Sequence, residues 1–125
     1  MKVSLNQLKL LLQQNVVELK FARRRPQPGE PMFRRMLCTN SYSLLNSTKG
    51  RVALNYRPPH NQLDYNPELK GLVVTWDIFE QDYRQINVAA CEVVATIKAN
   101  DEFWQYFNEK LAFMTEKQKI DFMRV

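Results

Sequence analysis

Glycine, cysteine and histidine are scarce in this chain of 125 residues, which contains three glycines, two cysteines and one histidine. Three glycines are too few for a glycine-rich phosphate loop or a long flexible linker. The two cysteines, Cys38 and Cys91, cannot form a disulfide framework, and we interpret them as reduced thiols packed in a core. The single histidine, His60, excludes a zinc site with two histidine ligands, and no paired Cys-x-x-Cys spacing replaces it.

Long apolar runs are also missing. The longest ones are about half of the roughly 20 residues that a membrane-spanning helix needs, so we expect no membrane partner. The first 15 residues lack the basic, apolar and small-residue segments of a signal peptide, which predicts a cytoplasmic protein. With 45% hydrophobic and 11% aromatic residues, the chain can nevertheless fill the core of one domain.

Signatures of catalysis are missing as well. The sequence has no nucleophile elbow, no phosphate loop and no dinucleotide fingerprint. His60 follows a proline and gives no support for a Cys–His nucleophile. Asp77, Glu80 and Asp82 form an acidic cluster, which we interpret as a solvated hairpin turn and not as an acid–base pair or a calcium loop. We therefore predict a protein that is not an enzyme and that needs no metal or other cofactor.

Charge is distributed unevenly along the chain. Residues 1–60 contain eleven Lys/Arg and two Asp/Glu, a net charge of +9, whereas residues 61–125 contain seven and eleven, a net charge of −4. Such asymmetry is typical of a protein with a face that meets an anionic partner. The alternative is that the basic and acidic halves interleave in space and neutralise each other.

Capping signals predict a helix at the beginning of the chain, over residues 1–15. Ser4 and Gln7 form a capping box, in which each side chain satisfies a backbone N–H of the other residue. Leucines then recur at helical spacing, and Asn15 is a suitable stop. We expect the leucines to pack against the rest of the domain.

The last segment, residues 99–125, is predicted to hold two helices. Asn100 caps the first helix, and Thr115 with Gln118 forms a second capping box for the other. Aromatic residues are expected on more than one face here: Phe103, Trp104, Tyr106, Phe107 and Phe113. One stripe of them can cover the domain, and the remainder can form a surface for a homo-oligomer or a partner protein.

Short strand patterns alternate with turns in the middle of the chain, residues 16–98. Val17, Leu19 and Phe21 repeat with a period of two, which indicates a half-buried strand. Residues 23–31 hold three prolines and one glycine and are therefore predicted to form a loop. Further strands are expected over residues 32–39, 51–56, 72–76, 83–87 and 91–97, with Phe21, Phe33, Trp76 and Phe79 in the core.

The order of these elements predicts the fold class. One helix, about five short strands and two helices, in a single domain of residues 1–125, are typical of an α+β protein built on a small antiparallel β-barrel. Residues 40–71 form an irregular insertion, with a helical turn that is predicted to end at Gly50. An insertion of this length in a compact domain is usually functional or mobile.

Two short motifs carry a resemblance to a known family. They are Arg34-x-Met36-x-Cys38-Thr39 and, in the later hairpin, Trp76-Asp77 followed by Tyr83-Arg84-x-Ile86. With these motifs, residues 16–98 resemble the small Sm-like or SH3-like β-barrel proteins of tailed bacteriophages, which are related to the WYL domains of bacterial regulators. The chain departs from the pattern in the 40–71 insertion, and at Tyr83, where many members have tryptophan.

This resemblance implies a phage origin, a small β-barrel and a place in the cytoplasm of a host cell. By analogy it implies binding of nucleic acid, or of a host protein from the transcription or defence machinery. A sensor of a small anionic ligand, as in WYL domains, is a further alternative. The family has no catalytic residues to carry over.

Arginine is concentrated in the first hairpin. The triplet at residues 23–25 lies at its loop and Arg34 and Arg35 lie on its return strand, so antiparallel pairing is expected to bring five guanidinium groups together. Phosphate is their natural partner, because a planar guanidinium group binds it with two parallel hydrogen bonds. The predicted nucleic-acid site consists of Arg23, Arg24, Arg25, Arg34, Arg35, Arg51, Arg57 and Tyr56. Ion pairing with the acidic half of the chain and plain solvation are the alternatives.

Aromatic residues beside irregular segments can stack on bases. Tyr42, Tyr56 and Tyr65 are the candidates, and core packing is the alternative for each. A continuous basic surface across residues 23–35 and 51–57 would favour nucleic acid. A checkerboard of paired charges would favour a protein partner or none.

Overall fold

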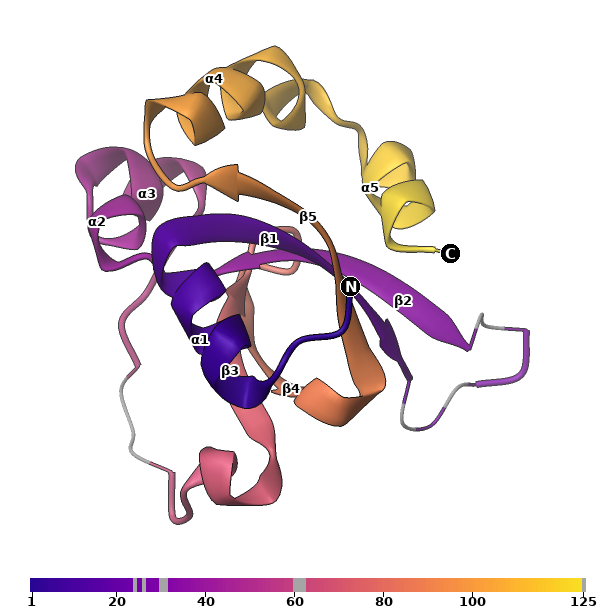
Figure 1. Cartoon of the computed structure of the whole chain (residues 1–125). Helices are drawn as coiled ribbons and strands as arrows, with labels where there is room; N and C mark the ends of the chain where they lie inside the picture. Colours follow the sequence, from indigo (N-terminus) through magenta and orange to yellow (C-terminus); the bar gives the residue numbers. More distant parts are fainter. Residues whose placement is uncertain (24, 26, 30–31, 60–62, 125) are drawn as a thin grey trace.

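An antiparallel sheet of five strands, in the order β4-β3-β2-β1-β5, forms the centre of the molecule (Figure 1). The computed structural model describes the chain apart from residues 24, 26, 30–31, 60–62 and 125. The strands are β1 (Asn15–Ala22), β2 (Phe33–Thr39), β3 (Leu72–Asp77), β4 (Asp82–Asn87) and β5 (Cys91–Lys98). β4 and β5 are the outer strands and do not pair with each other in the described part of the chain, so the sheet is not the closed barrel that the sequence predicted.

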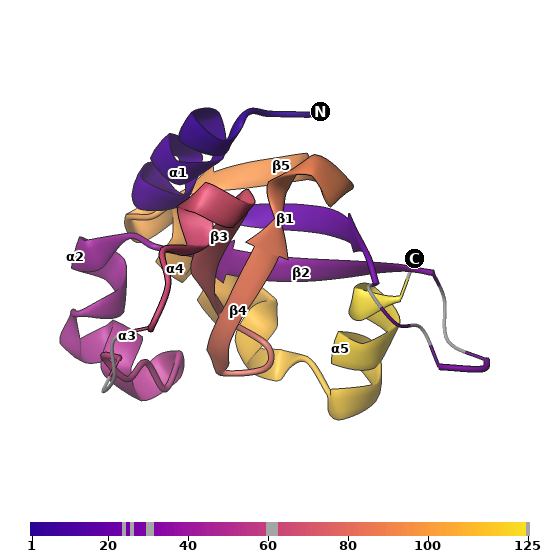
Figure 2. The same ribbon diagram turned by 90° about the horizontal axis from the view of Figure 1, so that it is seen from below.

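Helices lie on both sides of this sheet. They are α1 (Leu5–Gln14), α2 (Tyr42–Leu45), α3 (Thr48–Ala53), α4 (Asp101–Glu109) and α5 (Glu116–Met123), with the 3₁₀ helices η1 (Pro67–Lys70), η2 (Val88–Ala90) and η3 (Leu111–Phe113). Figure 2 shows α1 on one side of the sheet and α5 on the other. The α+β class, the N-terminal helix and the C-terminal helices are confirmed.

Both predicted capping boxes are present. Ser4 Oγ accepts the Gln7 N–H at 3.2 Å, and Gln7 Oε1 accepts the Ser4 N–H at 2.9 Å. Thr115 and Gln118 repeat this exchange at 3.1 and 2.9 Å. Asn15 ends α1, as predicted. These boxes satisfy backbone donors that the first turn of a helix leaves without partners.

Side chains alternate along β1 and divide the core between two faces of the sheet. Val17 packs with Leu8 and Leu12 of α1 on one face. Val16 belongs to a second cluster on the other face, which includes Trp76 and residues of the C-terminal helices. The period of two in the sequence therefore places one hydrophobic layer under α1 and another under α4 and α5.

Cys38 and Cys91 are buried and free, as predicted. Burial raises the pKa of both thiols, so neither is a ready nucleophile at neutral pH. No described helix is long and apolar enough to cross a membrane.

The predicted strand at residues 51–56 and the predicted core position of Phe33 are wrong. Ser47 Oγ accepts the Gly50 N–H at 2.9 Å and begins α3, so Gly50 lies inside a helix and does not end a turn. Phe33 is 45% exposed, with the Lys20 ammonium group 5.0 Å from the centre of its ring. In both cases a short apolar pattern fits two conformations or two faces, and contacts distant in sequence decide between them.

Candidate anion-binding site

The arginines of the first hairpin divide between the two faces of the sheet. Arg34 and Arg35 are neighbours on β2, and consecutive side chains of a strand point in opposite directions. Arg35 Nε donates to the Phe122 C=O of α5 at 3.0 Å, its guanidinium group lies 4.7 Å from the centre of the Phe122 ring, and Glu18 lies 4.0 Å away. The predicted cluster of five guanidinium groups is therefore wrong: Arg35 packs on Phe122 of α5, on the face of β2 opposite to Arg34, whose Nη2 reaches Met123 Sδ of the same helix at 3.2 Å.

Arg34 pairs with the carboxylate that ends β3 and with a carboxylate of the turn that follows. Its Nη2 donates to Glu80 Oε1 at 2.9 Å and lies 3.9 Å from Asp77 Oδ2. Arg84 Nε of β4 donates to the same Asp77 oxygen at 2.9 Å. Two arginines and two carboxylates thus form one network, which we call the Asp77 network. The basic and acidic halves of the chain do interleave here.

Asp77 is the buried centre of this network. Its side chain is 0% exposed, and Oδ1 accepts the backbone N–H groups of Phe79 and Glu80, each at 3.1 Å. The interpretation of a wholly solvated acidic turn is therefore wrong at Asp77. The carboxylate fixes the β3–β4 turn through Oδ1 and orients the arginines through Oδ2.

Burial governs the ionisation of the network. It lowers the pKa of Arg34, and the nearby positive charge of Arg84 lowers it further. Burial also raises the pKa of the Asp77 carboxyl, while the Glu80 N–H and the two arginines act in the opposite direction. The network as a whole is neutral when its four groups are charged, so its arginines are held in place without a large local excess of charge.

Four arginines line a cavity of about 280 Å³ beside this network. They are Arg23, Arg25, Arg34 and Arg84. The cavity lies between the outer strand β4 and the last residues of β1, and Ala90 of η2 also lines it. None of the described residues that line it is acidic, so Asp77 and Glu80 hold Arg34 and Arg84 from behind. We call this cavity the arginine site.

The hairpin and the turn position the arginines differently. The Arg23 N–H donates to the Met32 C=O at 2.8 Å and closes the base of the hairpin loop. Arg25 lies further out and is exposed. Arg34 is held almost completely buried. The site therefore combines two arginines fixed by carboxylates with arginines presented by a loop.

Arg35 and three further predicted site residues lie outside this cavity. Arg51 donates from Nη2 to Asn46 Oδ1 at 3.0 Å, and Arg57 donates from Nη2 to the Gln81 C=O at 3.2 Å. Tyr56 packs edge-on against Trp76. Arg24 lies outside the described residues.

The other two tyrosines that were candidate stacking platforms also lie apart from the site. Tyr65 exchanges hydrogen bonds with Gln85, whereas Tyr42 is 80% exposed on α2. Tyr42 is therefore the most open of the three, and Tyr56 is held in an aromatic cluster with Trp76 and Tyr83.

Arg84 is the site residue that the prediction missed. It was identified as part of a family-like hairpin motif, but not as a binding residue. Its signal lies in the hairpin register, which pairs Asp77 with Asp82 and Thr75 with Arg84. Residues two apart on one strand share a face, so Arg84 follows Asp82 toward the side of the sheet that holds Asp77.

Comparisons with models of known protein families, with curated proteins and with solved structures found no match. The fold and the site together define an α+β protein with an open five-stranded antiparallel sheet and an arginine-lined cavity at one edge of it.

Proposed function

We propose that this protein binds nucleic acid, and that the arginine site holds phosphate groups of the strand. The observation that carries the proposal is that four arginines line one cavity without an acidic residue among its described lining. Guanidinium groups bind phosphate oxygens with paired hydrogen bonds, and the Asp77 network orients two of them before the ligand arrives. The protein acts as a binding protein, without catalysis.

The proposal extends to the fold family and the origin of the protein. Strand order β4-β3-β2-β1-β5, with a helix before β1, suits an opened small barrel of the Sm-like or SH3-like kind. We infer a phage protein that acts in the cytoplasm of its host.

Fluorescence anisotropy with labelled single-stranded DNA, double-stranded DNA and RNA tests the proposal. The double variant Arg23→Ala/Arg25→Ala should weaken binding and reduce the slope of log K against log salt by about 2, because each phosphate contact contributes about 0.9 for duplex DNA. These two residues are chosen because they are not part of the Asp77 network.

A matched control removes the same charge elsewhere. Lys98→Ala/Lys110→Ala changes two exposed residues. Lys98 is the strand partner of Asn15, the first residue of β1, whereas the hairpin loop follows the last residue of β1. Equal weakening by both double variants would show binding through net charge alone and would contradict the arginine site. Absence of binding to all three nucleic acids at low salt would refute the function itself. Tight binding of inorganic phosphate with no binding of oligonucleotides would favour the small-anion sensor.

A protein partner is the second candidate, and it is favoured by a different surface. Val52 of α3 and Trp104 and Phe107 of α4 line a mainly apolar cavity of about 350 Å³, and Val52 is 78% exposed. An apolar surface of this kind is typical of interaction sites. Light scattering of the purified protein over a range of concentrations tests self-association through this surface, with Val52→Glu as the variant that should abolish it.

A further inference from the structure

Among the described residues, four of the six residues of β3 have no partner strand on the side away from β4. β3 pairs with β4 along its whole length but with β2 only at its last two residues. The Ile78 N–H just after β3 donates to the Leu37 C=O of β2 at 2.9 Å. Backbone groups alternate between the two sides of a strand, so Leu72 and Val74 also direct theirs toward the β2 side, where β2 has already ended.

Asn40 takes the place of a strand at one of these positions. Its Nδ2 donates to the Val74 C=O at 2.9 Å. The Leu72 N–H, the Leu72 C=O and the Val74 N–H have no hydrogen-bond partner among the described residues. Within the described part of the chain, two donors and one acceptor of this strand edge are therefore unpaired, and unpaired strand edges are templates for another chain.

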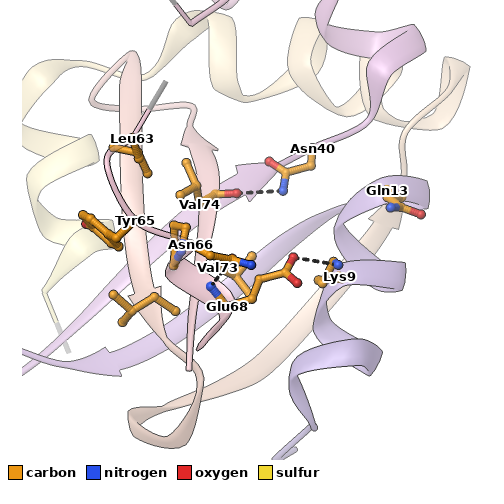
Figure 3. Close-up of a pocket in the computed structure, with 11 residues that line it drawn as sticks. Lys9, Gln13, Asn40, Leu63, Tyr65, Asn66, Glu68, Val73 and Val74 are labelled. Atoms are coloured by element: carbon orange, nitrogen blue, oxygen red, sulfur yellow. Dashed lines mark hydrogen bonds and ion pairs between the residues drawn. The ribbon is translucent and has the colours of Figure 1, made fainter. Parts of the chain in front are cut away.

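These groups face a groove of about 520 Å³, which Figure 3 shows. Leu72, Val73 and Val74 all line it, and three consecutive residues of a strand can line one cavity only along the edge of the strand. Lys9 of α1 and Glu68 of η1 form an ion pair of 2.7 Å across the groove (Figure 3). We call this cavity the β3-edge groove.

The walls of the groove indicate which side chains its ligand carries. Leu63 is 49% exposed and lines the groove beside Tyr65. Lys70 lies 4.5 Å from the centre of the Tyr65 ring and has no carboxylate partner among the described residues. Lys70 is not among the lining residues but lies beside the Tyr65 wall, so the groove offers an apolar contact at Leu63 with a positive charge close to it. This arrangement complements an apolar residue beside an acidic one.

We propose that the β3-edge groove binds an extended, acidic peptide segment of a partner protein, which adds to β3 as a short strand. The peptide supplies an acceptor for each of the two free N–H groups and a donor for the Leu72 C=O, as in other cases of strand addition. The Lys9–Glu68 ion pair does not block this, because both side chains are more than one-third exposed and such pairs are weak.

The test is selection of a displayed library of random hexapeptides on the immobilised protein. Enriched peptides should combine an acidic and an apolar residue and should shift the amide NMR signals of Leu72 and Val74. Val74→Pro removes only a groove-facing N–H, because the ladder to β4 uses the alternate residues, and it should weaken binding at least about tenfold. Leu63→Asp is the second variant; its exposed position keeps the fold intact, and its charge repels an acidic peptide.

Three outcomes would overturn the proposal. They are the absence of enriched peptides, enriched peptides whose signals map to the surface around Val52 and Trp104, and concentration-dependent shifts at Leu72 and Val74 without peptide, which would identify a second copy of this chain as the occupant. The Arg23→Ala/Arg25→Ala variant should bind the selected peptides as the wild type does. Peptide binding and nucleic-acid binding can therefore fail independently.

Discussion

Asp77→Ala is the substitution that tests the Asp77 network most directly. It removes the acceptor of two backbone N–H groups and the ion-pair partner of Arg84, and it removes one of the two carboxylates beside Arg34. Removing one partner of a buried ion pair costs about 3–5 kcal/mol, because the other charge stays buried. Arg34 keeps Glu80, and the Arg84 side chain is 34% exposed, so water replaces part of the loss. We therefore expect a loss of about 3 kcal/mol, near the lower end of that range.

Urea unfolding followed by tryptophan fluorescence measures this loss, since Trp76 is completely buried beside Asp77. Asp82→Ala is the matched control, because it removes an exposed carboxylate at the start of β4 that accepts only the neighbouring Tyr83 N–H, at 2.8 Å, among the described contacts; it should change the free energy of unfolding by about 1 kcal/mol or less. A loss at Asp77→Ala below about 1 kcal/mol, or one equal to that of the control, would refute the role of Asp77 as the centre of the network.

Two further predictions concern ionisation and packing. Burial raises the pKa of the Asp77 carboxyl in the folded state, so the folded protein binds this proton more tightly than the unfolded chain does. The free energy of unfolding of the wild type, relative to that of Asp77→Asn, should therefore increase as the pH falls toward the ordinary aspartate pKa of about 4. Urea unfolding of both proteins at several pH values checks the sign. Gly50→Ala should destabilise the protein by about 1–3 kcal/mol, because a Cβ at this position meets the backbone C=O groups of Leu44 and Leu45. A decrease in Tm of less than about 2 °C would contradict this prediction.

Local signals in the sequence predicted local structure. Each capping box joins two residues three positions apart, so Ser4 with Gln7 and Thr115 with Gln118 specify helix starts without help from the rest of the chain. The alternation in β1 likewise needs only neighbouring residues. For these elements the sequence pattern and the tertiary contacts agree, and the predictions are confirmed.

The parts that the sequence did not predict depend on contacts between distant residues. Arg34 and Glu80 are 46 positions apart, and no pattern in either segment indicates their pairing. Whether residues 51–56 continue as a strand or end a helix depends on the cap at Ser47 and on the packing of α3, because a run of six residues fits both. Whether the sheet closes into a barrel depends on pairing between β4 and β5, the two outermost strands, and no local pattern within either strand indicates whether they pair.

The Asp77 network also separates structural from functional arginines. Arg34, Asp77 and Arg84 all belong to the two short motifs identified in the sequence, and their mutual contacts give those motifs a structural reason. Loss of nucleic-acid binding in an Arg34 variant would therefore not distinguish a lost phosphate contact from a disrupted turn. Arg23 and Arg25 lie outside the motifs and line the same cavity. Binding that falls in their double variant while the free energy of unfolding stays unchanged would assign function to the loop and stability to the network.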